Sequence, residues 1–112
     1  MNISAQSVGK SLTSIILSGA LDANGADSIS VAMNAHARAG TDVAIDISKV
    51  TFLSSQGVRI LIQTAKVASA EKRSVALVAP SQSILKVLKV MGVDKIIKIH
   101  ESLESFVTES AS

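Results

Sequence analysis

Two adjacent serines, Ser54 and Ser55, lie where the hydrophobic pattern of the chain changes from that of a strand to that of a helix. Before them, Val43, Ile45 and Ile47 alternate with small or polar residues, as expected for a strand. After them, apolar residues recur at helical spacing. Ser54 is a good N-cap candidate because a serine oxygen accepts a hydrogen bond from an amide two or three residues on. In open α/β sheets, ligands and partners bind beyond the carboxyl ends of parallel strands. A serine there could be a phosphoacceptor, a nucleophile or only part of the first helical turn.

A catalytic nucleophile needs a general base within hydrogen-bond reach. The two histidines, His36 on an expected helix and His100 after an expected strand, are poor candidates for that base. The Gly-x-Ser-x-Gly nucleophile elbow is absent, because Leu53 occupies the place of its first glycine. Asp22 and Asp46 are not spaced like a metal-binding or glycosidase pair. We therefore predict that the protein is not an enzyme and has no catalytic residues, metal site or cofactor.

Gly57 and Arg59 closely follow the serines, and each has a structural and a functional interpretation. Gly57 costs the helix about 1 kcal/mol relative to alanine, and it could allow either close packing on the sheet or close approach of a partner. Arg59 lies four residues after Ser55 and shares its helical face. It could be solvated, or it could meet an acidic partner or a phosphate on Ser55. Asp22 could simply cap the turn that follows a strand.

The pattern of the whole chain predicts an α/β fold with a mixed, mainly parallel sheet of about five strands and about four helices. We expect Gly9-Lys10 to join the first two strands, and Asn24 to begin the first helix, which Gly40 ends. The expected strands cover residues 2–8, 12–17, 43–47, 75–78 and 96–99, and the expected helices cover residues 24–39, 55–71, 81–91 and 102–110.

Each expected helix has an apolar face that we predict to be buried. In chain order these faces are Ala26, Ile29, Met33 and Ala37; Val58, Leu61, Ile62, Ala65, Ala68 and Ser69; Ile84, Leu85, Leu88 and Met91; and Leu103, Phe106 and Val107.

Composition agrees with one domain spanning residues 1–112, since 47% of the residues are apolar and a chain of this size can bury a single core. The absence of cysteine suits a reducing compartment, and the first residues do not resemble a signal peptide, so we expect a cytoplasmic protein. No apolar run approaches the ~20 residues that span a bilayer, so membrane insertion is not expected. The net charge of +2 and the 2% aromatic content do not favour nucleic-acid binding.

Three segments resemble the STAS family, which includes the anti-sigma factor antagonists and cytoplasmic domains of sulfate transporters. The family signature is a strand ending in Asp-Leu-Ser, followed by Phe-x-Asp-Ser-Ser/Thr/Ala-Gly-Leu at a helix start. Residues 46–48 (Asp-Ile-Ser) and 52–58 (Phe-Leu-Ser-Ser-Gln-Gly-Val) fill these positions, and residues 18–22 match the family's Gly-x-Leu-Asp. Two residues depart from the pattern: Ser54 replaces the aspartate and Gln56 replaces a small residue. The resemblance extends from about Ser14 to Phe106.

The resemblance implies a single-domain anti-sigma factor antagonist in which Ser55 is the phosphorylated serine. The implied partners are an anti-sigma factor with a serine-kinase fold, which uses the ATP, and a PP2C-type phosphatase. The implied partner-binding residues are Asp22, Ser54, Ser55, Gln56, Gly57 and Arg59. Replacement of the aspartate by Ser54 reduces like-charge repulsion on a phosphate at Ser55, but it could also slow the kinase, and Ser54 could itself be phosphorylated. The alternative is a constitutive STAS subunit of a lipid-transport ATPase or stress-sensing complex, without a serine switch.

Overall fold

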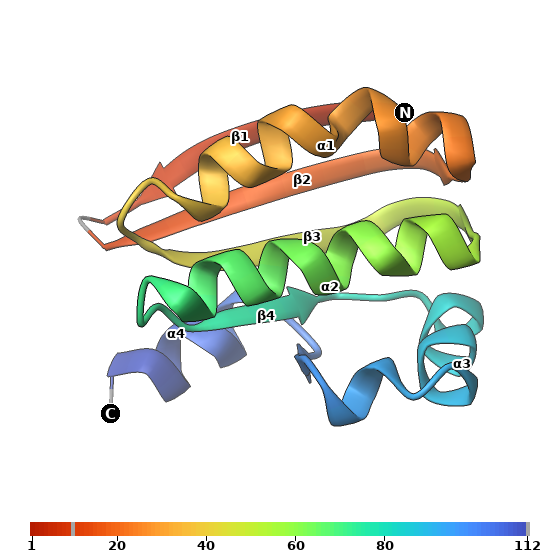
Figure 1. Cartoon of the computed structure of the whole chain (residues 1–112). Coiled ribbons are helices and arrows are strands. Elements are labelled where there is room, and N and C mark those ends of the chain that lie inside the picture. Colours follow the sequence, from red (N-terminus) through yellow and green to blue (C-terminus); the bar gives the residue numbers. More distant parts are fainter. Residues whose placement is uncertain (10, 112) are drawn as a thin grey trace.

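A computed structural model describes residues 1–9 and 11–111, which form one five-stranded sheet in the order β1-β2-β3-β4-β5 (Figure 1). β1 is antiparallel to β2 and all other neighbours are parallel, so the predicted mixed, mainly parallel sheet is confirmed. The predicted turn between β1 and β2 includes Gly9, which has a positive φ of 67°, whereas Lys10 lies outside the described residues. The strands are β1 (Asn2–Val8), β2 (Leu12–Leu21), β3 (Asp42–Leu53), β4 (Val75–Val78) and β5 (Lys98–His100).

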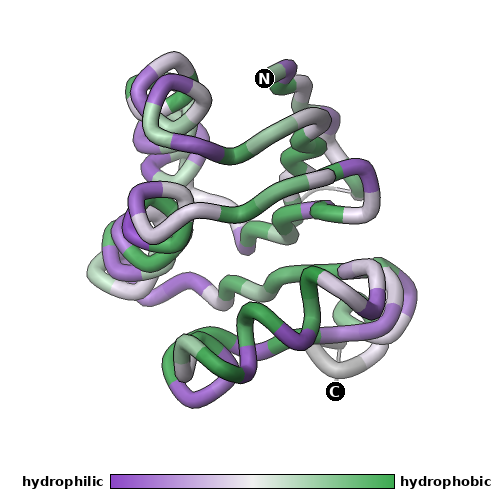
Figure 2. The backbone as a smooth tube through the Cα atoms, turned by 90° about the vertical axis from the view of Figure 1, so that its right-hand side faces the viewer, coloured by the Kyte–Doolittle hydropathy of each residue, from purple (hydrophilic) through white to green (hydrophobic). Residues whose placement is uncertain are grey.

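The described residues also form four α-helices and one short 3-10 helix. Helices α1 and α2 cover one face of the sheet and α4 covers the other, so that the sheet is the middle layer (Figure 2). Helix α3 adds Ile84 and Leu88 to the core on the side of α1 and α2. Within residues 1–9 and 11–111, none of the helices has the length and apolar character needed to cross a membrane. The helices are α1 (Ala23–Ala37), α2 (Ser55–Ala70), α3 (Gln82–Val90), η1 (Val93–Lys95) and α4 (Leu103–Ala111).

The core has two parts because the central strand β3 is buried on both faces. Ile45 and Ile47 point toward α1 and α2 and join the larger cluster with Leu61. Ala44 points to the opposite face and packs in a smaller cluster that includes Phe106 of α4. Continuous burial of this kind is expected for a parallel strand with helices on both sides.

Strands β2 and β3 are longer than the sequence pattern predicts. The prediction ended them at residues 17 and 47, whereas they continue to Leu21 and Leu53, which are paired with each other. The register shifts between Ile16 and Ser18 and between Gly19 and Ala20. Such irregularities reset the alternation of side chains between the two faces, so the second halves of these strands carry no clear period of two.

Several helix and strand boundaries also differ from the prediction. The N-cap of α1 is Asp22 and not Asn24, because the Asp22 carboxylate accepts a hydrogen bond from the amide of Gly25. α1 ends at Ala37, two residues before the predicted end, and β5 begins at Lys98 and not at residue 96. Residues 96 and 97 continue the turn after η1, because the amides of Ile96 and Ile97 both donate to the Val93 carbonyl oxygen.

Three residues predicted to be buried are exposed, and two buried residues of α2, Ile60 and Thr64, were missed. Met91 is 42% exposed because it lies beyond the end of α3, and Val107 of α4 is 37% exposed. On α2, Ser69 is exposed whereas Ile60 is buried, because α1 packs against α2 and turns its buried face toward Ile60. The other predicted faces lie at least partly inside.

Leu61 is fully buried at the centre of the larger cluster, so its truncation tests the packing of α2. We expect Leu61→Ala to lower the free energy of unfolding by about 2–5 kcal/mol, because the substitution leaves a cavity. Urea denaturation measures this change. The matched control is Val31→Ala on the exposed side of α1, which should change stability by less than about 0.5 kcal/mol. A similarly small effect of Leu61→Ala would contradict this packing.

Candidate functional site

The start of α2 is attached to the end of β2 through one carbonyl group. The backbone amide and the hydroxyl of Ser54 both donate to the carbonyl oxygen of Leu21, each at 3.0 Å. The same hydroxyl oxygen accepts a hydrogen bond from the Gly57 amide at 3.1 Å, which makes Ser54 the N-cap, as predicted. Ser54 is therefore half-buried, and its hydroxyl both donates and accepts within the domain.

Helix α1 begins in the same way beside α2. The Asp22 carboxylate accepts a hydrogen bond from the Gly25 amide at 2.7 Å. Asp22 and Ser54 directly follow Leu21 and Leu53, which are partners in the register of β2 and β3. The two N-caps therefore lie next to each other at the carboxyl edge of the sheet, where both helices start (Figure 1). Asp22 is close to the serines, as expected, but it also has the structural role of a cap.

The first turns of both helices pack directly on the end of β2. A Cβ atom on Gly57 would come within 2.7 Å of Leu21 Cγ and closer still to the Leu21 carbonyl oxygen, and one on Gly25 would lie 2.5 Å from the Ala20 carbonyl oxygen. Real Cβ atoms essentially never come this close to such atoms. Gly57 is buried, so the structure assigns it to packing on the sheet.

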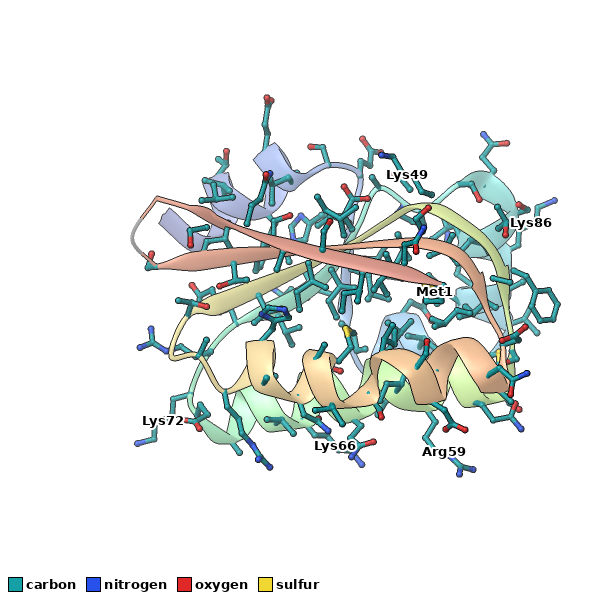
Figure 3. The ribbon with its side chains drawn as sticks, turned by 90° about the horizontal axis from the view of Figure 1, so that it is seen from above. Met1, Lys49, Arg59, Lys66, Lys72 and Lys86 are labelled. Carbon is teal, nitrogen blue, oxygen red and sulfur yellow. The ribbon has the colours of Figure 1, made fainter. Side chains whose placement is uncertain are left out.

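Ser55, Gln56 and Arg59 form the exposed side of the same helix start. The Ser55 hydroxyl donates to Oε1 of Gln56 at 3.3 Å and is otherwise open to solvent. Arg59 points away from the sheet on the outer side of the helical layer (Figure 3). The six predicted site residues therefore divide into three that build the helix starts and three that an incoming protein could touch.

The structure places the other candidate residues away from this surface. Asp46 accepts hydrogen bonds from the amide and the hydroxyl of Ser48, at 2.9 and 2.7 Å, seven residues before the end of β3. His36 lies in the last turn of α1, about 20 Å along the helix from its start. His100 lies at the end of β5, where its Nδ1 is 2.9 Å from the Ser105 hydroxyl. Neither histidine has a hydrogen bond with Ser55.

Sequence reasoning missed two features that lie beside Ser55. Phe52 is 54% exposed at the end of β3, although aromatic residues usually join the core. A groove with a volume of about 170 Å³ runs between the first turns of α1 and α2, and Gln56, Arg59 and Asp27 are among its lining residues. No sequence signal could have revealed the groove, because it depends on how two separate helices pack.

The family model described as "Mlab, STAS domain" matches residues 5–100. An anti-sigma factor antagonist from Mycobacterium paratuberculosis has the same fold, with a TM-score of 0.88 at 22% identity over 99% of this chain and 94% of that chain. The unphosphorylated anti-sigma factor antagonist SpoIIAA gives 0.80 at 18% identity, over 98% and 96% of the two chains. Bacillus SpoIIAA in its phosphorylated form gives 0.72 at 17% identity, over 97% and 99%. No curated protein matches by sequence.

The two serines are a matched pair for testing which hydroxyl supports the fold. We expect Ser54→Ala to lower the free energy of unfolding by about 0.5–2 kcal/mol, because the N-cap hydrogen bond is lost. Ser55→Ala should change stability by less than about 0.5 kcal/mol, because its hydroxyl is exposed. Thermal and urea denaturation of both variants measure the difference. Equal losses of stability would show that the two hydroxyls do not differ in structural role.

Gly57 allows a second test, because alanine is the better helix former by about 1 kcal/mol. We expect Gly57→Ala nevertheless to destabilise the domain by about 1–3 kcal/mol, because the added methyl group overlaps Leu21. The control is Gln63→Ala at an exposed position of the same helix. A gain of stability in Gly57→Ala would contradict the close packing on β2.

Proposed function

Because the chain belongs to the STAS domain family, we propose that it is an anti-sigma factor antagonist whose binding is switched off by phosphorylation of Ser55. The observation that carries the proposal is the exposed Ser55 hydroxyl at the start of α2, next to a Ser54 hydroxyl that is already bonded within the fold. The similarity to SpoIIAA, which has both unphosphorylated and phosphorylated structures, supports it.

Ser55 occupies a position where a phosphate is compatible with the folded domain. Phosphorylation adds about −1.5 to −2 charge at neutral pH. A negative charge at an exposed helix N-terminus is favoured by about 0.3–1 kcal/mol. The modified domain therefore stays folded, and the effect falls on the surface around Ser55.

A partner packed on the first turn of α2 would have to remove water from the phosphate. Burying an unpaired charge costs several kcal/mol, which exceeds the favourable interaction with the helix terminus. A loss of about 4 kcal/mol corresponds to roughly a thousandfold in affinity. Phosphate on Ser55 therefore acts as an off signal.

In this proposal the chain supplies an acceptor hydroxyl and a binding surface, and it is not an enzyme. The partner is an anti-sigma factor with a serine-kinase fold, which binds ATP and transfers its γ-phosphate to Ser55. A PP2C-type phosphatase restores the hydroxyl. The protein acts in the cytoplasm, where it regulates transcription by competing with a sigma factor for the anti-sigma factor.

One observation favours a second candidate, a constitutive STAS subunit of a larger assembly such as a lipid-transport ATPase or a stress-sensing complex. Ser54 occupies the position of the family's aspartate and is bonded to Leu21 and Gly57, so it contributes no carboxylate for a kinase to recognise. In that case the same surface would bind a partner permanently. Binding measurements with and without phosphate distinguish the two candidates.

The decisive experiment is titration of the cognate serine-kinase-type anti-sigma factor, without ATP, with four forms of the domain. Wild type and Ser55→Ala should bind alike, whereas protein phosphorylated on Ser55 should bind roughly a thousandfold more weakly. Ser55→Asp should reproduce part of this loss while its melting temperature stays near that of wild type. If phosphorylated protein binds as tightly as Ser55→Ala, the switch is wrong and the constitutive-subunit proposal replaces it.

A further inference from the structure

The groove between α1 and α2 has an apolar floor and walls of opposite charge. Its floor includes Ala26 and Ile60, which are only 6% and 5% exposed. Asp27 of α1 and Arg59 of α2 line it as well, and both are exposed. The groove lies against the first turns of the two helices, directly beside Ser55.

The two charges of the groove are available to another molecule. Among residues 1–9 and 11–111, the side chains of Asp27 and Arg59 have no hydrogen bond or ion pair with other parts of the domain. A protein segment that fits the groove would place an apolar side chain on Ile60, a basic group toward Asp27 and a carboxylate toward Arg59. Such complementarity contributes mainly to specificity and to the rate of association.

The groove is connected to Ser55 through two neighbouring side chains. Gln56, which lines the groove, accepts the Ser55 hydroxyl hydrogen bond. A phosphate dianion has only acceptor oxygens and cannot replace that donor. Arg59 lies one helical turn after Ser55, and helical side chains tilt toward the N-terminus of their helix. Its guanidinium is therefore within reach of a phosphate on Ser55, which it can bind through two parallel hydrogen bonds.

We propose that this groove is the docking site for a segment of the anti-sigma factor carrying a basic and an acidic side chain, and that a phosphate on Ser55 draws Arg59 out of it. This inference rests on the proposed function and adds its mechanism. Phosphorylation then removes the cation that the partner's carboxylate needs, in addition to placing an unfavourable charge at the interface. Gln56 turns at the same time, because its former donor is gone.

The first test needs no partner and uses the full chain with phosphoserine at position 55. A nearby cation favours the dianion and lowers the pKa of the phosphate. The second pKa of a phosphoserine is ordinarily about 6. In a ³¹P NMR titration, the midpoint should therefore lie several tenths of a pH unit lower in wild type than in Arg59→Gln. The control is Lys66→Gln, which removes the same charge from the same helix roughly 16 Å along the axis from position 55. Equal midpoints in wild type and Arg59→Gln would overturn the movement of Arg59.

The second test measures binding to the same serine-kinase-type anti-sigma factor, without ATP and at low salt. Asp27→Asn and Arg59→Gln should each weaken binding of the unmodified domain about tenfold, with melting temperatures unchanged. Glu71→Gln and Lys66→Gln, which lie outside the groove, should bind within twofold of wild type. The loss of affinity on phosphorylation should also be about tenfold smaller in Arg59→Gln than in wild type.

The possible outcomes distinguish a failure of the proposed docking groove from a failure of the proposed phosphorylation switch. If phosphorylation weakens binding but Asp27→Asn and Arg59→Gln bind like wild type, the groove is not the docking site although the switch stands. If the groove variants bind weakly but phosphorylation reduces affinity equally in wild type and Arg59→Gln, Arg59 does not transmit the signal. If phosphorylation has no effect on wild type, the proposed function itself fails.

Discussion

The carbonyl group of Leu21 is the point on which the functional surface depends. It ends β2, accepts two hydrogen bonds from Ser54, and is in close contact with Gly57. These contacts fix the first turn of α2 against the sheet. An error in the length of β2 or β3 would displace that turn, because Leu21 and Leu53 must be in register for Ser54 to reach the carbonyl group. The exposed hydroxyl of Ser55 thus stands on a helical turn that is hydrogen-bonded to the end of β2.

This arrangement gives two neighbouring serines different roles. Ser54 donates to a carbonyl oxygen and accepts from an amide, so its hydroxyl belongs to the fold. An aspartate in the same place could accept the Gly57 amide bond, but an ionised carboxylate has no proton to donate to Leu21. The serine therefore adds a link between α2 and β2 that the family's aspartate does not make in this way. Ser55, one residue later, is exposed, and its hydroxyl donates to the side chain of the neighbouring Gln56.

The same construction appears at the start of α1 and produces the groove. Asp22 and Gly25 repeat the relation between Ser54 and Gly57, and each glycine packs on a backbone carbonyl group near the end of β2. The two helices begin side by side at the ends of β2 and β3, and they pack against each other. Their facing side chains then form a groove whose position relative to Ser55 is set by the backbone.

Features that depend only on neighbouring residues could be predicted from the amino-acid pattern. The change from strand to helical spacing located α2, the hydroxyl of Ser54 identified its N-cap, and the short apolar run of β4 (Val75–Val78) was predicted with its correct bounds. These are local properties, because spacing and capping involve residues within one or two turns. The difference in role between Ser54, as the N-cap, and Ser55, in the first helical turn, also followed in part from this local pattern.

The other features of the fold and the site depend on contacts between residues far apart in the chain, so only the tertiary structure shows them. The pairing of β2 with β3 extends both strands through two irregularities that erase the alternation of side chains. Packing of α1 on α2 buried Ile60 and left Ser69 exposed. The Leu21 carbonyl and Ser54 are separated by 33 residues, so no local pattern could indicate their hydrogen bond. The groove with Asp27 and Arg59 exists only because two helices from different parts of the chain begin at the same sheet edge.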